Sequence, residues 1–165
     1  MKTKYSFIQE ELNDFLDRAG KATYAGGGKP EKNPERPGFI EYAYEEKDFV
    51  YRDSYVGFYR SRGMEVARYQ GKPVWTSMYG GGMTKGNKEL ANECFKFLKK
   101  ALRSPRKGFI SFRGPRLLQD GDWKYAYHQE GDRYEFWGYE EIFYKEKLVF
   151  FHRVIGGIVE DRIRS

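Results

Sequence analysis

Apolar residues recur at helical spacing in two separate stretches of the chain. Residues 6–19 are predicted to form the first helix, with a capping box of Ser6 and Gln9 at its start and Gly20 as its stop. Residues 88–102 are predicted to form the second helix. The apolar stripe of the first helix consists of Ile8, Leu12, Phe15, Leu16 and Ala19.

Strand patterns fill the two stretches that follow these helices, over residues 39–79 and 123–155. Short turns, not helices, connect the strands, and this arrangement favours antiparallel hairpins. The order of helix, strand block, helix, strand block predicts an α+β fold. We expect a strongly curved antiparallel sheet built from hairpins, with two α-helices packed against one side of it.

Glycine and proline predict where these segments turn or stop. Gly80-Gly81-Gly82 is expected to end the first strand block, and Gly131-Asp132 is a plausible two-residue turn that would place His128 opposite Glu135. The loop over residues 26–38 is rich in proline, glycine and charge, and we expect it to be mobile. There is no linker and no short repeat, so residues 1–165 are predicted to form a single domain.

The charge of the chain is concentrated in one segment. The 165 residues include 30 Lys and Arg against 24 Asp and Glu, a net charge of +6. Residues 94–119 hold eight of the basic residues and no acid. Such a segment attracts phosphates of nucleic acid or of a small ligand. Half of these residues also fit the solvent face and last turn of the second helix, where cations favour the helix dipole.

A single cysteine, Cys94, excludes an intramolecular disulfide and a metal site built from several thiolates. The N-terminus lacks the apolar run of a secretory signal, and no apolar stretch has the length of a spanning helix. We therefore expect a cytoplasmic protein with no membrane partner and no metal. No phosphate-binding or dinucleotide-binding glycine motif is present, so no cofactor is predicted.

Seven short motifs occur in an order that is specific as a set. They are Tyr24-Ala25-Gly26-Gly27-Gly28, Arg36-Pro37-Gly38, Tyr51-Arg52-Asp53-Ser54-Tyr55, Gly71-Lys72-Pro73-Val74-Trp75, Phe112-Arg113-Gly114-Pro115, Gly121-Asp122-Trp123 and Gly138-Tyr139-Glu140-Glu141-Ile142. Over about Ala22 to Gly157, the chain resembles the prokaryotic family catalogued as domain of unknown function 5680. The resemblance implies no established activity. Some similar bacterial chains carry a helix-turn-helix domain ahead of this module, which implies a sensing or regulatory role; the leader here, with one predicted helix, is too short for such a domain.

The leading functional prediction is a small-ligand-binding or sensory module with a pocket on the concave face of the sheet. Arg52 and Asp53 lie in an apolar strand pattern and point to opposite faces, so each needs a partner or an open cavity. An edge strand with solvated charges is the alternative. The candidate ligand-binding residues are Arg52, Asp53, Tyr55, Trp75, Arg113 and Trp137. The arginines would bind an anionic group of a small molecule, Asp53 would accept a hydrogen bond, and the aromatic residues would form the walls.

Two other functions also fit the sequence. A hydrolase-like or other enzyme would use His128 or His152 with a nearby carboxylate, because a neutral imidazole is the usual general base near neutral pH. A three-residue turn at residues 145–147 would place His152 opposite Glu140, whereas a two-residue turn would not. A nucleic-acid-associated protein would use the basic segment 94–119.

Overall fold

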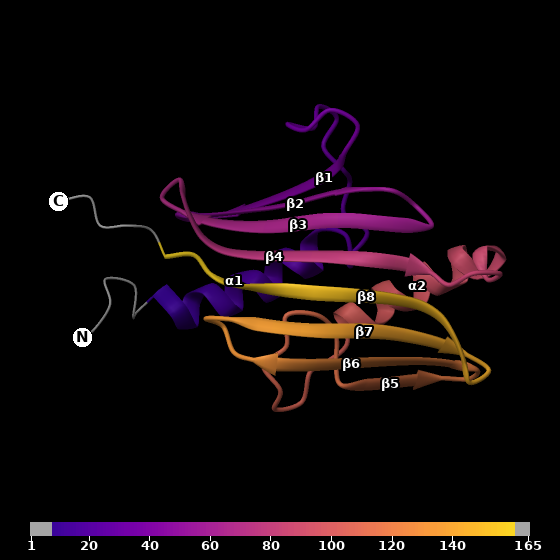
Figure 1. Cartoon of the computed structure of the whole chain (residues 1–165). Helices are drawn as coiled ribbons and strands as arrows, with labels where there is room; N and C mark the ends of the chain where they lie inside the picture. Colours follow the sequence, from indigo (N-terminus) through magenta and orange to yellow (C-terminus); the bar gives the residue numbers. More distant parts are fainter. Residues whose placement is uncertain (1–7, 161–165) are drawn as a thin grey trace.

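The computed structural model describes residues 8–160. It has two α-helices, α1 (Ile8–Ala22) and α2 (Ala91–Arg103), and a short 3-10 helix, η1 (Lys88–Leu90), leads into α2. The strands are β1 (Ile40–Glu46), β2 (Phe49–Val56), β3 (Arg60–Tyr69), β4 (Lys72–Met83), β5 (Leu117–Asp120), β6 (Trp123–Gly131), β7 (Phe136–Tyr144) and β8 (Lys147–Ile158). Figure 1 shows both α-helices on the same side of the strands.

All of these strands belong to one antiparallel sheet with the order β1-β2-β3-β4-β8-β7-β6-β5. The sheet is curled and is not closed, and β1 and β5 form its two edges. This architecture confirms the predicted α+β class, with a curved antiparallel sheet and two helices. The curl gives the sheet a concave face, which the helices cover.

Two similar halves meet where β4 pairs with β8 (Figure 1). The first half consists of α1 and β1–β4, and the second half consists of α2 and β5–β8. Each half is a helix followed by a four-stranded antiparallel meander. The strand registers define matching positions: Tyr51 in β2 matches Tyr125 in β6, and Glu65 in β3 matches Glu140 in β7.

The match between the halves includes an irregularity of the sheet. A β-bulge shifts the register between Ala67 and Arg68, where β3 pairs with β4. A second bulge shifts it between Ile142 and Phe143, where β7 pairs with β8. These sites lie 75 positions apart in the chain. Because a bulge bends the bulged strand locally, both halves curve at the same place.

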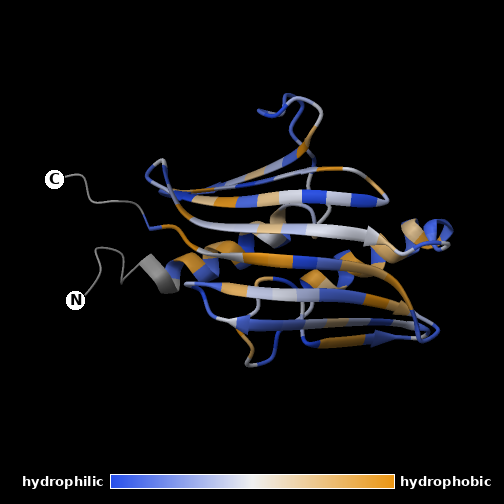
Figure 2. Ribbon diagram, viewed as in Figure 1, coloured by the Kyte–Doolittle hydropathy of each residue, from blue (hydrophilic) through white to orange (hydrophobic). Residues whose placement is uncertain are grey.

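Both helices bury one face against the sheet. Residues three and four positions apart share a face of a helix, so the buried side chains form a stripe. Figure 2 shows hydrophobic and hydrophilic residues interleaved along both helices. The matching buried residues are Leu12, Phe15 and Ala19 in α1 and Cys94, Phe97 and Ala101 in α2.

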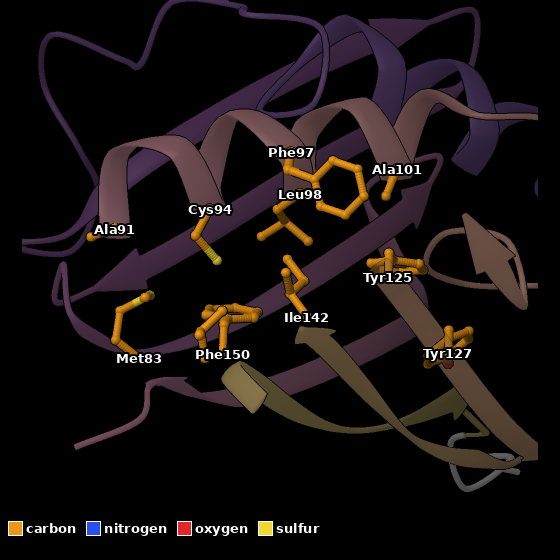
Figure 3. Packing of buried hydrophobic residues seen from close by; sticks show 11 residues of the cluster. Met83, Ala91, Cys94, Phe97, Leu98, Ala101, Tyr125, Tyr127, Ile142 and Phe150 are labelled. Carbon is orange, nitrogen blue, oxygen red and sulfur yellow. The ribbon is translucent and has the colours of Figure 1, made fainter. Parts of the chain in front are cut away.

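The second half has a well-filled core under α2. Figure 3 shows Cys94 and Leu98 of α2 directed toward Ile142 and Phe150 of the sheet. Ile142 is fully buried, and Phe150 is 1% exposed. Burial of such side chains contributes roughly 1.5–3 kcal/mol each, so this core anchors the second half.

The helices differ slightly from their predicted bounds. The first extends to Ala22 rather than to residue 19, and the second is split into η1 and α2. The capping box at Ser6 lies outside the described residues. The loop over residues 26–38 has no regular helix or strand, and its mobility stays a prediction.

The prediction that Gly80-Gly81-Gly82 ends the first strand block is wrong, because these glycines lie inside β4 and pair with both β3 and β8. A Cβ at Gly82, whose φ is +140°, would lie 2.1 Å from the backbone oxygen of Tyr59. Glycine is needed here for close approach of two backbones and not for a turn.

The two-residue turn predicted at Gly131-Asp132 is also wrong. Gly131 pairs with Phe136, and His128 therefore lies opposite Tyr139 instead of Glu135. The Asp132 carboxylate accepts a hydrogen bond of 2.8 Å from the backbone N–H of Tyr134, a local bond that favours the longer loop.

The second bulge determines which residues pair in the hairpin of β7 and β8. Residues 145–146 form a two-residue turn, since Tyr144 pairs with Lys147. The bulge beside Ile142 then adds one residue to β8, and Glu140 lies opposite His152. The pairing expected from a three-residue turn is therefore present, but it has a different cause.

Candidate functional site

A cavity of about 680 Å³ lies between the concave face of the sheet and the two helices. Residues of β1–β4 and β8 form its floor, and residues of α1, α2 and the segment after α2 form its other walls. None of the described residues of β5, β6 and β7 lines it. The cavity therefore belongs mainly to the first half of the molecule.

Four of the six predicted ligand-binding residues line this cavity. Asp53 and Tyr55 come from β2, Trp75 comes from β4, and Arg113 comes from the segment between α2 and β5. Arg52 is not in its lining, because alternate residues of a strand point to opposite faces. That these residues bind a ligand stays a prediction.

Arg52 and Ser54 lie on the convex face of the sheet and bind the same carboxylate. The guanidinium of Arg52 donates to Glu41 at 2.8 Å, and the hydroxyl of Ser54 donates to it at 2.9 Å. The backbone N–H of Glu35 also donates to Glu41, so the proline-rich loop is tied to this face. Arg52 is thus a structural partner on the convex face, and neither a solvated edge charge nor a cavity residue.

Trp137 lies on the convex face as well. Its side chain is exposed, its residue exposure is 48%, and its ring centroid lies 6.1 Å from that of His128. The next residue along β7 in each direction, Phe136 and Gly138, is buried. Trp137 was predicted to form a pocket wall with the other aromatic candidates, but strand alternation directs its side chain away from the cavity.

Arg113 is buried in a charged cluster of the second half. Its Nη2 donates to Oε2 of Glu140 at 2.9 Å, and its Nε donates to Oε1 at 3.3 Å. The hydroxyl of Tyr125 donates to Glu140 at 2.7 Å. Burial alone would raise the pKa of Glu140, but Arg113 and the hydrogen bonds outweigh it and lower the pKa to about 2.

His152 links this cluster to the cavity. Its Nδ1 lies 3.3 Å from Oε2 of Glu140, and its Nε2 lies 3.1 Å from the hydroxyl oxygen of Ser61. Burial lowers the pKa of His152 despite its contact with Glu140, so the neutral imidazole is favoured. Gly81 pairs with both Ser61 and His152, so no side chain stands between them on the intervening strand.

The other histidine is placed very differently. His128 has a side chain that is 43% exposed, and its Nε2 lies 3.3 Å from Glu130 on the same strand. It is absent from the cavity lining. Of the two histidines predicted for acid–base chemistry, the structure brings only His152 to the cavity.

A pair of carboxyl groups lies on the cavity floor. Asp53 and Glu65 are direct partners across β2 and β3. The hydroxyl of Tyr79 donates to Asp53 at 2.8 Å, and the hydroxyl of Tyr51 donates to Oε1 of Glu65 at 2.7 Å. Burial, followed by the nearby charge of Glu65, raises the pKa of Asp53 to about 7.

Three polar atoms of the cavity lining are buried without a hydrogen-bond partner among the described residues. They are Oδ1 of Asn13, Oε2 of Glu65 and the indole Nε1 of Trp75. Trp75 is 2% exposed. Buried polar atoms are nearly always paired, so each unpaired one needs an explanation. Two acceptors and a donor in one cavity are suited to a ligand that carries the complementary groups.

Aromatic rings form much of the cavity wall. Tyr42 and Tyr55 stack with their centroids 6.5 Å apart, and Tyr24 meets both edge-on at 6.1–6.2 Å. Phe112 packs against Trp75 at 5.6 Å. Walls of this type bind flat apolar groups and stabilise cations that lie over ring faces.

The basic segment 94–119 does not form a uniform free surface. Arg113 is buried with Glu140, Arg106 pairs with Asp17, and Lys100 pairs with Asp120. That this segment binds nucleic acid stays a prediction.

The described residues include no group of three or more His, Cys, Asp and Glu side chains arranged to hold a metal ion. Cys94 is free and buried, and burial raises the pKa of its thiol. Between residues 8 and 160, neither helix combines the length and the apolar character that a membrane crossing requires.

Sequence reasoning missed Ser61, Glu65 and Tyr79. No motif surrounds them, and each acquires its role only through pairing across strands. The match between the halves is the signal that could have found Glu65, because its counterpart Glu140 was already a candidate.

The family model described as Domain of unknown function (DUF5680) matches residues 53–159, well over half of the chain. No curated protein and no solved structure matches the chain. The matched region runs from within β2 to just beyond β8, so it contains Asp53, Glu65, Arg113 and His152.

Proposed function

We propose that this chain, which belongs to the DUF5680 family, binds a small organic molecule in the cavity on its concave face and serves as a sensory or regulatory module. The observation that carries the proposal is a cavity of about 680 Å³ with aromatic walls and three buried polar atoms that have no hydrogen-bond partner among the described residues. Small-ligand pockets typically measure ~300–1,000 Å³ and combine apolar walls with a few placed polar groups. The free, buried thiol of Cys94 is consistent with a role in the reducing cytoplasm.

Native mass spectrometry of freshly purified protein tests this proposal. We expect a species heavier than the bare chain by the mass of one small molecule. The variant Ser61→Phe should lose that species, because it adds to the cavity lining the ring that the second half has at the matching position, Phe136. Met78→Phe is the matched control, since Met78 is exposed and does not line the cavity.

Two results together would contradict ligand binding. One is a wild-type spectrum that contains the bare chain alone. The other is the same thermal unfolding temperature with and without each member of a panel of small aromatic cations, neutral compounds and anions. A ligand that binds only the folded state must raise this temperature at concentrations above its Kd.

A specific observation favours a second candidate, an enzyme of acyl transfer. Ser61, His152 and Glu140 form a hydroxyl–imidazole–carboxylate chain with separations of 3.1 and 3.3 Å. In such a chain the serine oxygen attacks an ester carbonyl while its proton passes to His152 Nε2. That proton then passes to the alcohol that leaves. Water next attacks the acyl-serine while its proton passes to His152 Nε2, and this proton returns to the serine oxygen as the acid is released.

Labelling with a fluorophosphonate tests this second candidate, because the serine oxygen would form a bond to phosphorus and release fluoride. We expect one label on Ser61, lost in Ser61→Ala and strongly reduced in His152→Asn. Ser54→Ala is the matched control, since Ser54 lies on the convex face and binds Glu41. Absence of any label on the wild-type protein would exclude a reactive Ser61.

A further inference from the structure

We propose that the ligand of the cavity carries a protonated nitrogen group, such as an amidinium, guanidinium or ammonium, held by the carboxyl groups of Glu65 and Asp53. The inference rests on the proposed ligand-binding function and adds the chemical class of the ligand. It reverses the charge that the two predicted arginines suggested. Arg52 lies on the convex face, and Arg113 already binds Glu140.

The comparison of Glu65 with Glu140 shows what the first half lacks. Each glutamate accepts a hydrogen bond of 2.7 Å from the matching tyrosine, Tyr51 or Tyr125. Glu140 receives further hydrogen bonds from the guanidinium of Arg113 and contacts His152. Among the described residues, Oε2 of Glu65 has no hydrogen-bond partner. A ligand cation at Glu65 would therefore play the part that Arg113 plays at Glu140.

The position opposite Glu65 supplies no hydrogen-bond partner for its free oxygen either. His152 lies across the sheet from Glu140, whereas Ser77 lies across from Glu65. Ser77 is fully buried, and its hydroxyl has no partner among the residues described. An ionised carboxylate that is buried without a cation is costly, and a charge-assisted hydrogen bond contributes ~1.5–3 kcal/mol. The first half is thus suited to a cation supplied from outside the chain.

Other groups of the cavity fit the remainder of such a molecule. The rings of Tyr24, Tyr42 and Tyr55 meet at one wall and suit a flat apolar body. Nζ of Lys99 already lies 4.7 Å from the centroid of the Tyr24 ring. The unpaired indole N–H of Trp75 points independently to a ligand, because this buried donor needs an acceptor. The geometry favours a compact aromatic or apolar cation that also carries an oxygen or nitrogen acceptor.

Asp53 would respond to the arrival of a cation. The titratable and charged groups that act on it are Glu65 of β3, Tyr79 of β4, Arg113, and the tyrosines Tyr24, Tyr51 and Tyr55. Burial and Glu65 keep its pKa near 7, so Asp53 is partly protonated at neutral pH. A bound cation favours the ionised carboxylate, and binding should therefore release part of a proton.

Three probes of nearly the same shape separate charge from fit: benzamidine, which is a cation at neutral pH, neutral benzamide and anionic benzoate. Their affinities are measured by isothermal titration calorimetry at pH 7 in two buffers with different ionisation enthalpies. We expect benzamidine to bind wild-type protein about tenfold or more tightly than benzoate. Its observed enthalpy should change with the buffer, as proton release requires.

Two variants locate the cation. Glu65→Gln keeps the shape of the side chain and removes its charge, and it should weaken benzamidine binding about tenfold or more while leaving benzamide binding unchanged. Glu45→Gln is the matched control, because Glu45 is exposed and lies outside the cavity lining. Circular dichroism confirms that both variants are folded. The order of the three probes on wild-type protein decides the proposal even if Glu65→Gln does not fold.

The possible failures are distinct. Binding of benzoate or benzamide at least as tight as that of benzamidine would overturn the cation proposal and leave ligand binding intact. Equal binding of benzamidine to wild-type protein and folded Glu65→Gln would also overturn it. No binding of any probe, together with a bare-chain mass spectrum, would overturn both proposals.

Discussion

The two halves of this molecule share one plan and differ in what they place on the concave face. In the second half, Tyr127, Phe136 and Ile142 are all buried. The matching positions in the first half are Asp53, Ser61 and Ala67, which are smaller or more polar. The same meander therefore encloses a filled core in one half and a cavity in the other.

Glu140, which is fully buried, and Glu65, which is half-buried, show the same contrast in electrostatic form. Glu140 is neutralised by Arg113, whereas Glu65 is bonded to a tyrosine and, between residues 8 and 160, to no cation. From one satisfied and one unsatisfied carboxylate we propose that the second half provides stability and that the first half binds the ligand. The predictions below test this division.

The largest effect is expected from Arg113→Ala. This change leaves the fully buried Glu140 without its guanidinium, and removal of one partner of a buried ion pair typically costs ~3–5 kcal/mol. Urea unfolding should show a loss of unfolding free energy of that order. Arg18→Ala is the control, because its ion pair with Glu46 is exposed, and it should change stability little. Equal losses in the two variants would show that the cluster does not anchor the second half.

Asp53→Asn should change how stability depends on pH. In the unfolded chain the aspartate ionises around its ordinary pKa of 3.8, whereas in the folded chain it keeps its proton up to about 7. The folded state is therefore progressively disfavoured as pH rises from about 4 to about 7, by at most a few kcal/mol. The unfolding free energy of Asp53→Asn minus that of wild type should increase as the pH rises from about 4 to about 7, and it should stay constant above pH 7. A difference that is constant with pH would show that Asp53 is not held protonated.

Removal of one hydroxyl from each half provides a matched pair. Tyr125→Phe loses the bond to Glu140 and also leaves the backbone N–H of Gly114 unpaired, and it should cost ~1–3 kcal/mol. Tyr51→Phe loses one bond to Glu65 and should cost less. Chemical unfolding of both variants gives the comparison. A larger cost for Tyr51→Phe would contradict the assignment of stability to the second half.

The smallest effect on stability is expected from Glu65→Gln in protein freed of ligand. The change removes a buried charge that has no bonded cation, so the unfolding free energy should stay nearly constant or rise slightly. Glu140→Gln, the matching change in the second half, should be clearly destabilising because it breaks the ion pair with Arg113. Equal destabilisation by the two changes would mean that Glu65 is also neutralised by the chain.

The fold could be predicted because its signals are local. Alternating strands, short turns and two apolar helical stripes indicate hairpins with helices on one face. The place of Gly80-Gly81-Gly82 inside β4 could not be predicted, because the need for glycine there comes from the backbone of Tyr59, which is distant in the sequence and adjacent in space. The similarity of the halves was hidden as well, since matching positions such as Ser61 and Phe136 differ in residue type.

The candidate site could be predicted only in part. Alternation along β2 separates Arg52 from Asp53, but nothing local says which face is concave. The partner of Arg113 is 27 positions away in the chain, so its neutralisation by Glu140 depends on the tertiary fold. The chemistry of Ser61 and Glu65 likewise arises from strand pairing, which a search for short motifs does not detect.

A crystal structure of the protein in complex with benzamidine tests the central claim most directly. We expect density for the probe in the cavity of the first half, with its amidinium within hydrogen-bond distance of Oε2 of Glu65. The contradicting result is a cavity closed by side chains, with Glu65 bonded to Ser77 or Arg113 and the probe excluded.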